Sequence, residues 1–137
     1  MSSPQRLFGR RADLALGLVV VALVALLFWV SWFGGSVVAD IREAIQRAIP
    51  AGDKVGHFVL YGAISFFAAL RFRRTVVVAV VSLLIFGLGV FDEIRQMGEA
   101  DRSVSATDLL ANGSGIVAGV VAARVILHLW TSREMRL

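Results

Sequence analysis

The stretch "LALGLVVVALVALLFWVSWF", Leu14–Phe33, decides the fold class because it contains no charged residue. A helix rises about 1.5 Å per residue, so an apolar run of this length crosses a hydrocarbon core of about 30 Å. Arginines precede the run, as in a secretory signal peptide. However, it exceeds the roughly 7–15 apolar residues of such peptides, and its tryptophan-rich end lacks a small-residue cleavage site. The stretch therefore predicts an uncleaved transmembrane helix.

The composition of the whole chain is that of a membrane protein. Of its 137 residues, 58% are hydrophobic and 18% are charged, whereas soluble domains have about 25% charged residues. The absence of cysteine excludes disulfides, thiol catalysis and cysteine metal ligands. The net charge of +4 comes from short arginine clusters beside apolar runs. Aromatic and basic residues do not alternate as single-strand binding requires, so no nucleic-acid partner is expected.

Three further apolar segments each predict a span. They cover residues 55–70, 76–91 and 109–130. The last is the least apolar, because it contains Asn112, Ser114, Arg124 and His128, and it needs neighbouring helices to shelter these polar atoms. The sequence thus predicts an all-α membrane protein, a bundle of four transmembrane helices. Its single domain covers residues 14–130, between an N-terminal segment 1–13 and a tail 131–137.

A shorter amphipathic segment follows the first span. In "SVVADIREAIQRAIPAGDK", Ser36–Lys54, apolar residues recur every three or four positions and charged or amide residues fill the rest. This pattern predicts a short helix lying in the membrane interface and ended by Pro50 and Gly52.

The arginines predict the orientation. They gather before the first span, between the second and third, and after the fourth: Arg6, Arg10, Arg11, Arg71, Arg73, Arg74, Arg133 and Arg136. The two other connections contain at least as many acids as bases. By the positive-inside rule both termini and the 71–74 connection are cytoplasmic, and the mixed-charge connections face outward.

Polar residues of three predicted helices then fall at the same outward level. The second span begins with Asp53, Lys54, His57 and Tyr61, the third ends with Asp92, Glu93 and Gln96, and the fourth begins after Arg102 and Ser105 with Asp108 and Asn112. Spacings of three and four residues place each group on one helical face. These side chains are therefore expected to line one outward-facing pocket.

Each of these residues also has a structural interpretation. Asp108 suits the first turn of a helix that Ser105 or Thr107 caps, and Tyr61 suits an interfacial aromatic belt. Lys54 and Arg102 suit lipid headgroups, and Asn112 an interhelical hydrogen bond. Gly115 and Gly119 form a small-xxx-small pair that permits close helix packing. A charge within a span costs on the order of 2.5–3.5 kcal/mol, so several at one depth predict mutual pairing, a bound ligand, or both.

The same residues form three motifs that resemble the VanZ-like family of small bacterial membrane proteins. The motifs are "DKVGHFVLYG", "FDEIRQ" and "RSVSATDLLANGSGIVAG", in that order. They match the family pattern at Asp53, Lys54, His57, Phe58, Asp92, Glu93, Gln96, Arg102, Ser103, Ser105, Asp108, Asn112 and Gly115. The loop "MGEAD" departs from the pattern, because apolar residues with proline or glycine are common there. The resemblance covers Asp53–Gly119 and implies that the protein lies in a bacterial cytoplasmic membrane. The namesake of the family is associated with resistance to teicoplanin.

Three functions are compatible with this set of residues. The first is binding or handling of an anionic envelope lipid or lipid-linked cell-wall intermediate, with Lys54, Gln96, Arg102, Ser105, Asp108 and Asn112 as ligand-binding residues. The second is a membrane hydrolase or transferase, with His57, Asp53, Glu93 and Asp92 as catalytic candidates. A divalent cation is the cofactor such a site would accept, through His57, Glu93 and Asp108. The third is a structural or regulatory role, in which the charges only hold the helices together.

Overall fold

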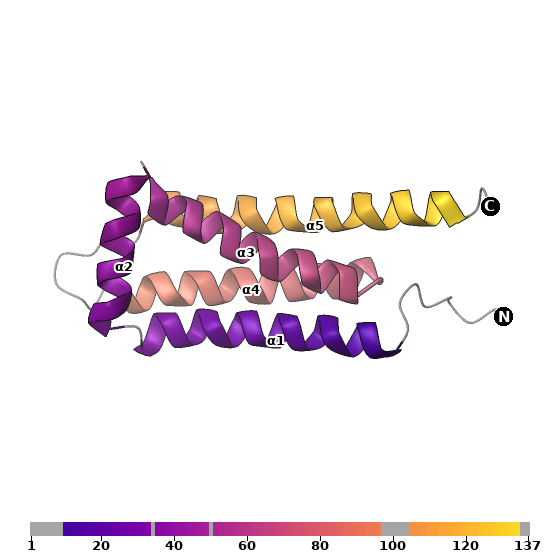
Figure 1. Cartoon of the computed structure of the whole chain (residues 1–137), viewed down its shortest axis with the longest axis horizontal. Coiled ribbons are helices and arrows are strands. Elements are labelled where there is room, and N and C mark those ends of the chain that lie inside the picture. Colours follow the sequence, from indigo (N-terminus) through magenta and orange to yellow (C-terminus); the bar gives the residue numbers. More distant parts are fainter. Residues whose placement is uncertain (1–9, 34, 50, 97–104, 135–137) are drawn as a thin grey trace.

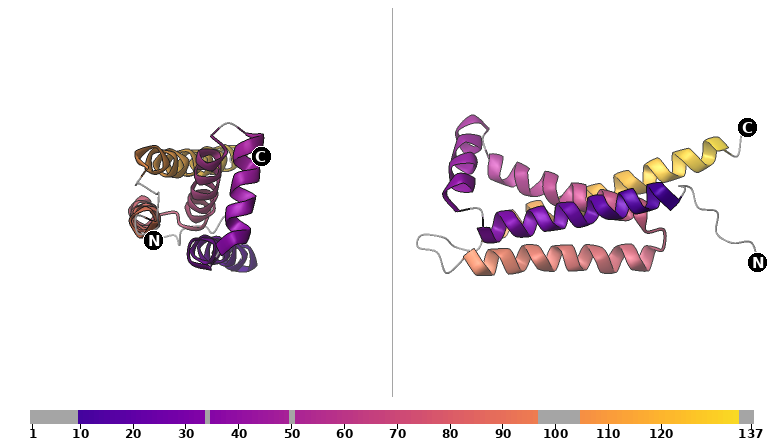
Figure 2. Two further views of the ribbon diagram at one scale, coloured as in Figure 1. Left: turned by 90° about the vertical axis from the view of Figure 1, so that its left-hand side faces the viewer. Right: turned by 60° about the horizontal axis from the view of Figure 1, so that its bottom comes forward.

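The chain folds into five helices in a computed structural model that describes residues 10–33, 35–49, 51–96 and 105–134 (Figure 1). The helices are α1 (Arg10–Phe33), α2 (Gly35–Ala48), α3 (Gly52–Arg71), α4 (Thr75–Gln96) and α5 (Ala106–Glu134). The described ranges contain no strand, so the predicted all-α class is confirmed. Four helices run along the long axis, and α2 crosses one end of the bundle (Figures 1 and 2).

Three of the described helices, α1, α4 and α5, are long and apolar enough to cross a membrane. The predicted spans 14–33, 76–91 and 109–130 lie within them. The span predicted over 55–70 lies in α3, which does not meet this standard, so a four-span bundle stays a prediction. The reason is local, because the first two turns of α3 carry Asp53, Lys54 and His57. These residues lower the apolarity of the helix as a whole.

Helix α3 lies inside the bundle and contacts each of the other four helices. Its contact with α5 is the most extensive in the described part of the chain. Six of its residues are buried, namely Gly52, Tyr61, Ile64, Ser65, Ala68 and Ala69. A helix that packs against four others is partly shielded from lipid, and it therefore tolerates more polar residues than α1 or α4.

Glycines bring α3 and α5 together. A Cβ atom added at Gly115 would collide with the carbonyl oxygen of Phe58, and one added at Gly119 would collide with that of Gly62. Both obstacles are backbone atoms, which no change of rotamer moves aside. The small-xxx-small prediction for this pair is thus confirmed. Close packing of this kind stabilises helices in a membrane, where lipid tails are as apolar as the side chains.

Apolar side chains fill the space between the helices in two clusters. The larger is made of Leu27, Tyr61, Ile64, Ile85 and Ile116, and the smaller of Ala69, Val78 and Ala123. Tyr61 is only 1% exposed. The interpretation of Tyr61 as an interfacial belt residue is therefore wrong: α3 turns this face toward α1, α4 and α5 rather than toward lipid.

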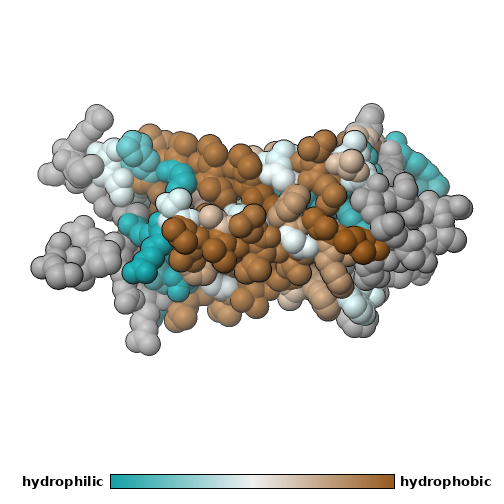
Figure 3. Space-filling model, turned by 180° about the vertical axis from the view of Figure 1, so that it is seen from behind, coloured by the Kyte–Doolittle hydropathy of each residue, from teal (hydrophilic) through white to brown (hydrophobic). Residues whose placement is uncertain are grey.

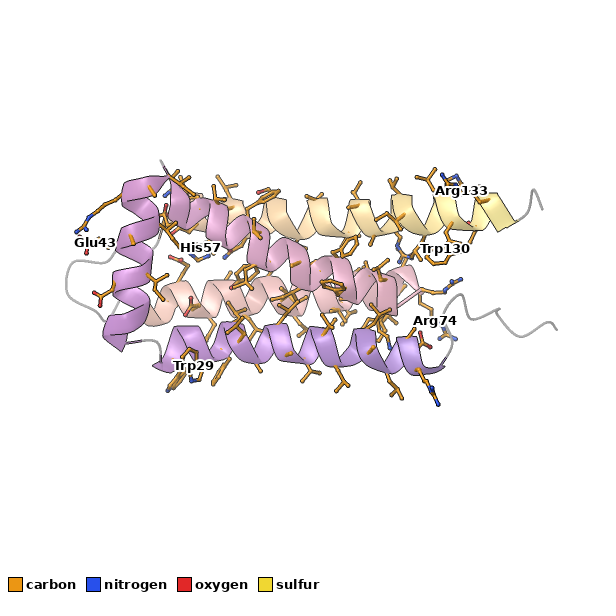
Figure 4. The ribbon with its side chains drawn as sticks, viewed as in Figure 1. Trp29, Glu43, His57, Arg74, Trp130 and Arg133 are labelled. Atoms are coloured by element: carbon orange, nitrogen blue, oxygen red, sulfur yellow. The ribbon has the colours of Figure 1, made fainter. Side chains whose placement is uncertain are left out.

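The outer surface is apolar along the middle of the bundle and polar toward its ends. Figure 3 shows a brown band across the middle, with hydrophilic residues toward both ends. Large apolar side chains such as Leu18, Val76 and Leu83 are at least 69% exposed. Trp29 and Trp130 lie near opposite ends (Figure 4), as tryptophans do at the two interfaces of a membrane. This surface is that of a membrane protein.

The two ends of the bundle differ in charge. The beginning of α1, the connection from α3 to α4 and the end of α5 share one end (Figure 1). That end carries Arg11, Arg73, Arg74 and Arg133, and Arg124 donates a hydrogen bond to the Arg73 carbonyl at 3.2 Å. The opposite end holds α2, the beginning of α3 and α5, and the end of α4. On α2, Ile41 and Ile45 are exposed and share one face.

Replacing Gly119 with alanine should destabilise the bundle, because the new methyl group meets the backbone of Gly62. We expect the free energy of unfolding to fall by about 1–3 kcal/mol, the usual cost of overpacking. Gly113→Ala on the same helix is the matched control, because its Cβ would lie 3.5 Å from the Phe86 ring, at ordinary contact distance. Thermal unfolding in detergent measures both variants, and equal stability of the two would contradict the close approach.

Candidate functional site

Polar side chains converge at the end of the bundle that α2 crosses, where α3 and α5 begin and α4 ends (Figures 1 and 4). We call this group the polar cluster. It consists of Asp53, Lys54, His57, Glu93, Asp108 and Asn112. The predicted meeting of three helices, α3, α4 and α5, is thus seen in the structure. Glu93 and Asn112 are buried, whereas the other four residues are partly buried.

His57 is held by Asn112 of the neighbouring helix. Nδ1 of His57 lies 3.0 Å from Oδ1 of Asn112. An amide oxygen only accepts hydrogen bonds, so Nδ1 carries the proton, and in the neutral ring Nε2 keeps its lone pair. Asn112 is only 1% exposed, and the His57 ring stacks on Tyr61 at 6.3 Å. The imidazole is therefore fixed in one orientation, and Nε2 remains able to accept a proton or bind a cation.

Asn112 and Tyr61 fit together because Gly89 of α4 has no side chain. A Cβ at Gly89 would lie 2.8 Å from Nδ2 of Asn112 and 3.0 Å from the Tyr61 hydroxyl. Sequence reasoning missed this glycine. The only available signal was its place one helical turn before Glu93.

Glu93 is a buried carboxylate, 5% exposed. Its Oε2 atom accepts a hydrogen bond from the backbone N–H of Ser105 at 3.1 Å. This bond ties the end of α4 to the residue before α5. A carboxylate so nearly removed from water requires hydrogen bonds or a cation nearby, because burying an uncompensated charge is costly.

Lys54 connects α3 to α5. Its Nζ atom lies 3.0 Å from Oδ2 of Asp53 and 3.5 Å from Oδ1 of Asp108. Partial burial alone would raise the pKa of Asp53, but the hydrogen bonds and charge of Lys54 outweigh it, so this pKa lies below its ordinary value. The hydrogen bond to Asp53 likewise raises the pKa of Lys54. Both groups are therefore charged at neutral pH, and a single ammonium group serves two carboxylates.

Ser105 caps α5, as one structural interpretation predicted. Its hydroxyl accepts a hydrogen bond from the backbone N–H of Asp108 at 3.2 Å and lies 2.8 Å from the Thr107 hydroxyl. A serine that accepts from the third helical residue satisfies one of the free N–H groups at a helix start. Asp108 stands in the same first turn, where a carboxylate suits the helix dipole. The predicted ligand-binding roles of both residues stay predictions.

His57, Glu93 and Asp108 come closest to a shared centre. Each offers one ligand atom, and these three atoms lie within 4.8 Å of one another. The three residues come from α3, α4 and α5. Such an arrangement can hold a cation, or it can pair a general base with nearby acids.

Two of the predicted ligand-binding groups lie outside the described side chains. Arg102 falls in the range 97–104, and the side chain of Gln96 at the end of α4 is not described. Asp92 is half-buried and lies beside residues of α1. Among the described residues, it is the one charged residue that lines a groove between α1 and α4.

This groove has a volume of about 640 Å³. Its walls are Val20, Val21, Val24, Ala25, Leu27, Phe28, Trp29, Trp32, Leu88, Phe91 and Asp92. The groove is therefore almost wholly apolar and ends beside the polar cluster, since Asp92 and Glu93 are consecutive. Sequence reasoning missed it, because an apolar side chain facing a groove has the same pattern as one facing lipid.

A family model described as VanZ/LLP1 matches residues 15–128 of the chain. The chain belongs to the VanZ/LLP1 family. The family resemblance predicted from three motifs is thereby confirmed, and the match extends beyond Asp53–Gly119 to include α1. No curated protein and no solved structure matches this VanZ/LLP1 chain.

Proposed function

We propose that this VanZ/LLP1 protein binds and handles an anionic envelope lipid or a lipid-linked cell-wall intermediate. The headgroup would lie at the polar cluster and the apolar chain in the groove between α1 and α4. One observation carries the proposal: Asp92 lines the groove, and the next residue, Glu93, belongs to the polar cluster. The two sites are thus adjacent, as the two parts of an amphiphile are.

The chemistry of each part suits such a ligand. The groove lies along α1 and α4, two helices able to span a membrane, so its natural occupant is an acyl or isoprenoid chain. At the polar cluster, Lys54 can donate to a phosphate, and Asp108 can accept from hydroxyl or amide groups. Arg102 and Gln96, which neighbour the cluster in sequence, are proposed to contribute there.

The proposed side of the membrane is the outer face of the bacterial cytoplasmic membrane. The support is the sorting of charge, since arginines gather at the end opposite to the polar cluster. In this orientation the exposed isoleucines of α2 would lie in the outer interface. A link to teicoplanin resistance, with which the family's namesake is associated, would follow from an outward site for cell-wall intermediates.

A second candidate function is a hydrolase or transferase acting on the same class of lipid. It is favoured by the surroundings of His57, whose Nδ1 is hydrogen-bonded to Asn112 and whose ring lies close to the carboxylates of Glu93 and Asp108. That is the arrangement of a general base beside groups that can act as acids. A purely structural role rests on the bridge from Lys54 to Asp108. Turnover of a retained lipid separates the enzyme from the binder.

Filling the groove should weaken lipid retention. In Ala25→Phe the added ring occupies the groove, so we expect native mass spectrometry to show several-fold less isoprenoid phosphate bound to the purified protein. Ala22→Phe is the matched control, because Ala22 lies on the same helix and is exposed, but does not line the groove. Equal loss in both variants, or none in either, would contradict a chain site in the groove.

The headgroup contact has its own comparison in the same measurement. Lys54→Gln removes the ammonium group of the polar cluster and should reduce retention of a lipid phosphate. Diacylglycerol, a lipid without a phosphate, serves as the uncharged comparison and should bind to this variant as it does to the wild type. Arg74→Gln removes a positive charge at the opposite end (Figure 4) and should leave retention unchanged. If Arg74→Gln weakens retention as much as Lys54→Gln does, general attraction to a basic protein explains the binding.

Cysteine labelling tests the orientation, because the chain has no cysteine of its own. Glu43 on α2 and Arg74 between α3 and α4 are exposed and lie at opposite ends (Figure 4). In intact cells we expect an impermeant maleimide to label Glu43→Cys and not Arg74→Cys. In inside-out vesicles the result should reverse. Labelling of position 74 alone from outside the cell would place the polar cluster in the cytoplasm.

A further inference from the structure

We propose that His57, Glu93 and Asp108 form a binding site for one divalent cation. Their ligand atoms lie within 4.8 Å of one another and come from three different helices. Cations such as Zn²⁺ and Mn²⁺ bind nitrogen and oxygen ligands at about 2.0–2.2 Å, so opposite ligands of one ion lie roughly 4 Å apart. The three atoms therefore lie close to the separation that one shared ion requires.

The second observation is the hydrogen bond that orients the histidine. Histidines that bind metals donate their other ring N–H to an oxygen, which fixes the ring and its tautomer. Asn112 supplies such an oxygen at 3.0 Å from Nδ1 and is almost completely buried. In the neutral ring this bond leaves the lone pair of Nε2 free to bind a cation. Asn112 is thus a positioning residue for the cation site.

The balance of charge at the site also calls for a cation. Glu93 and Asp108 place two carboxylates within 4.8 Å of each other, and Lys54 is already shared between Asp108 and Asp53. The Oδ1 atom of Asp108 is buried, and its ion-pair partner is the shared ammonium group of Lys54 at 3.5 Å. A divalent ion among these groups would neutralise both carboxylates.

The ligand set indicates the class of ion. One imidazole and two carboxylates suit Zn²⁺ or Mn²⁺ better than Ca²⁺, which takes six to eight oxygen ligands, and there are no thiolates to select softer ions. Three protein ligands leave coordination positions open for water or for a phosphate oxygen. The role toward a lipid phosphate rests on the function proposed above, whereas the cation site itself does not.

Titration of the chelator-treated, full-length protein in lipid-free detergent tests the site. With Zn²⁺ and with Mn²⁺ alone, isothermal titration calorimetry should show one bound ion per chain. Glu93→Gln, which keeps an oxygen for the Ser105 N–H, and His57→Gln should each weaken binding about tenfold or more. His128→Gln is the matched control, because His128 is the only other histidine and is exposed on the arginine-rich half of α5. It should bind as the wild type does.

A second readout separates loss of the site from loss of the fold. The cation should raise the unfolding temperature of the wild-type protein and of His128→Gln, but not that of a folded Glu93→Gln protein. Asn112→Leu should weaken the ion about 10- to 100-fold, and Asn112→Asp, which keeps an acceptor for the ring, should not. The cation site is overturned if the wild type binds no ion, or if Glu93→Gln and His57→Gln bind the ion as tightly as the wild type does. Cation binding without lipid binding would instead contradict only the proposed function.

Discussion

The close approach of α3 to α5 is the constraint on which the rest of the structure depends. Gly115 and Gly119 present bare backbone to Phe58 and Gly62, and no side chain fits between them. Because α5 comes so near, α3 lies inside the bundle and touches every other described helix. The polar side chains of its first turns are then partly buried by protein. A helix with Asp53, Lys54 and His57 facing hydrocarbon would incur a cost on the order of 2.5–3.5 kcal/mol per charge.

The same contact sets the register of the polar cluster. Two polar interactions that cross from α3 to α5, His57 to Asn112 and Lys54 to Asp108, lie toward the same end as the Phe58–Gly115 approach. A shift of one residue along the glycine contact would separate both pairs. Helix α4 completes the cluster through Glu93, whose hydrogen bond to the Ser105 N–H joins the two sides of the connection to α5. The packing that excludes lipid is therefore also the packing that assembles the chemistry.

Much of this arrangement follows from the sequence, and the exceptions have physical reasons. Apolar length predicts α1, α4 and α5. Four-residue spacing predicts that His57 shares a helical face with Asp53, and Asn112 with Asp108. The burial of Tyr61 does not follow from spacing, because a tyrosine near a helix end suits an interface equally well until the neighbours of α3 are known. The groove between α1 and α4 escapes for a similar reason. Whether α3 itself is a span cannot be read from hydropathy, since a helix enclosed by others need not be apolar.

The central claim is that the polar cluster and the groove form one site for an amphiphile with a cation at its head. An experimental density map of the protein, purified with its native lipids and without added chelator, tests this most directly. The account predicts a strong peak among His57, Glu93 and Asp108, with connected density extending past Asp92 along the groove. A map in which these side chains contact only each other and Lys54, and lipid density lies elsewhere on the bundle, would contradict it.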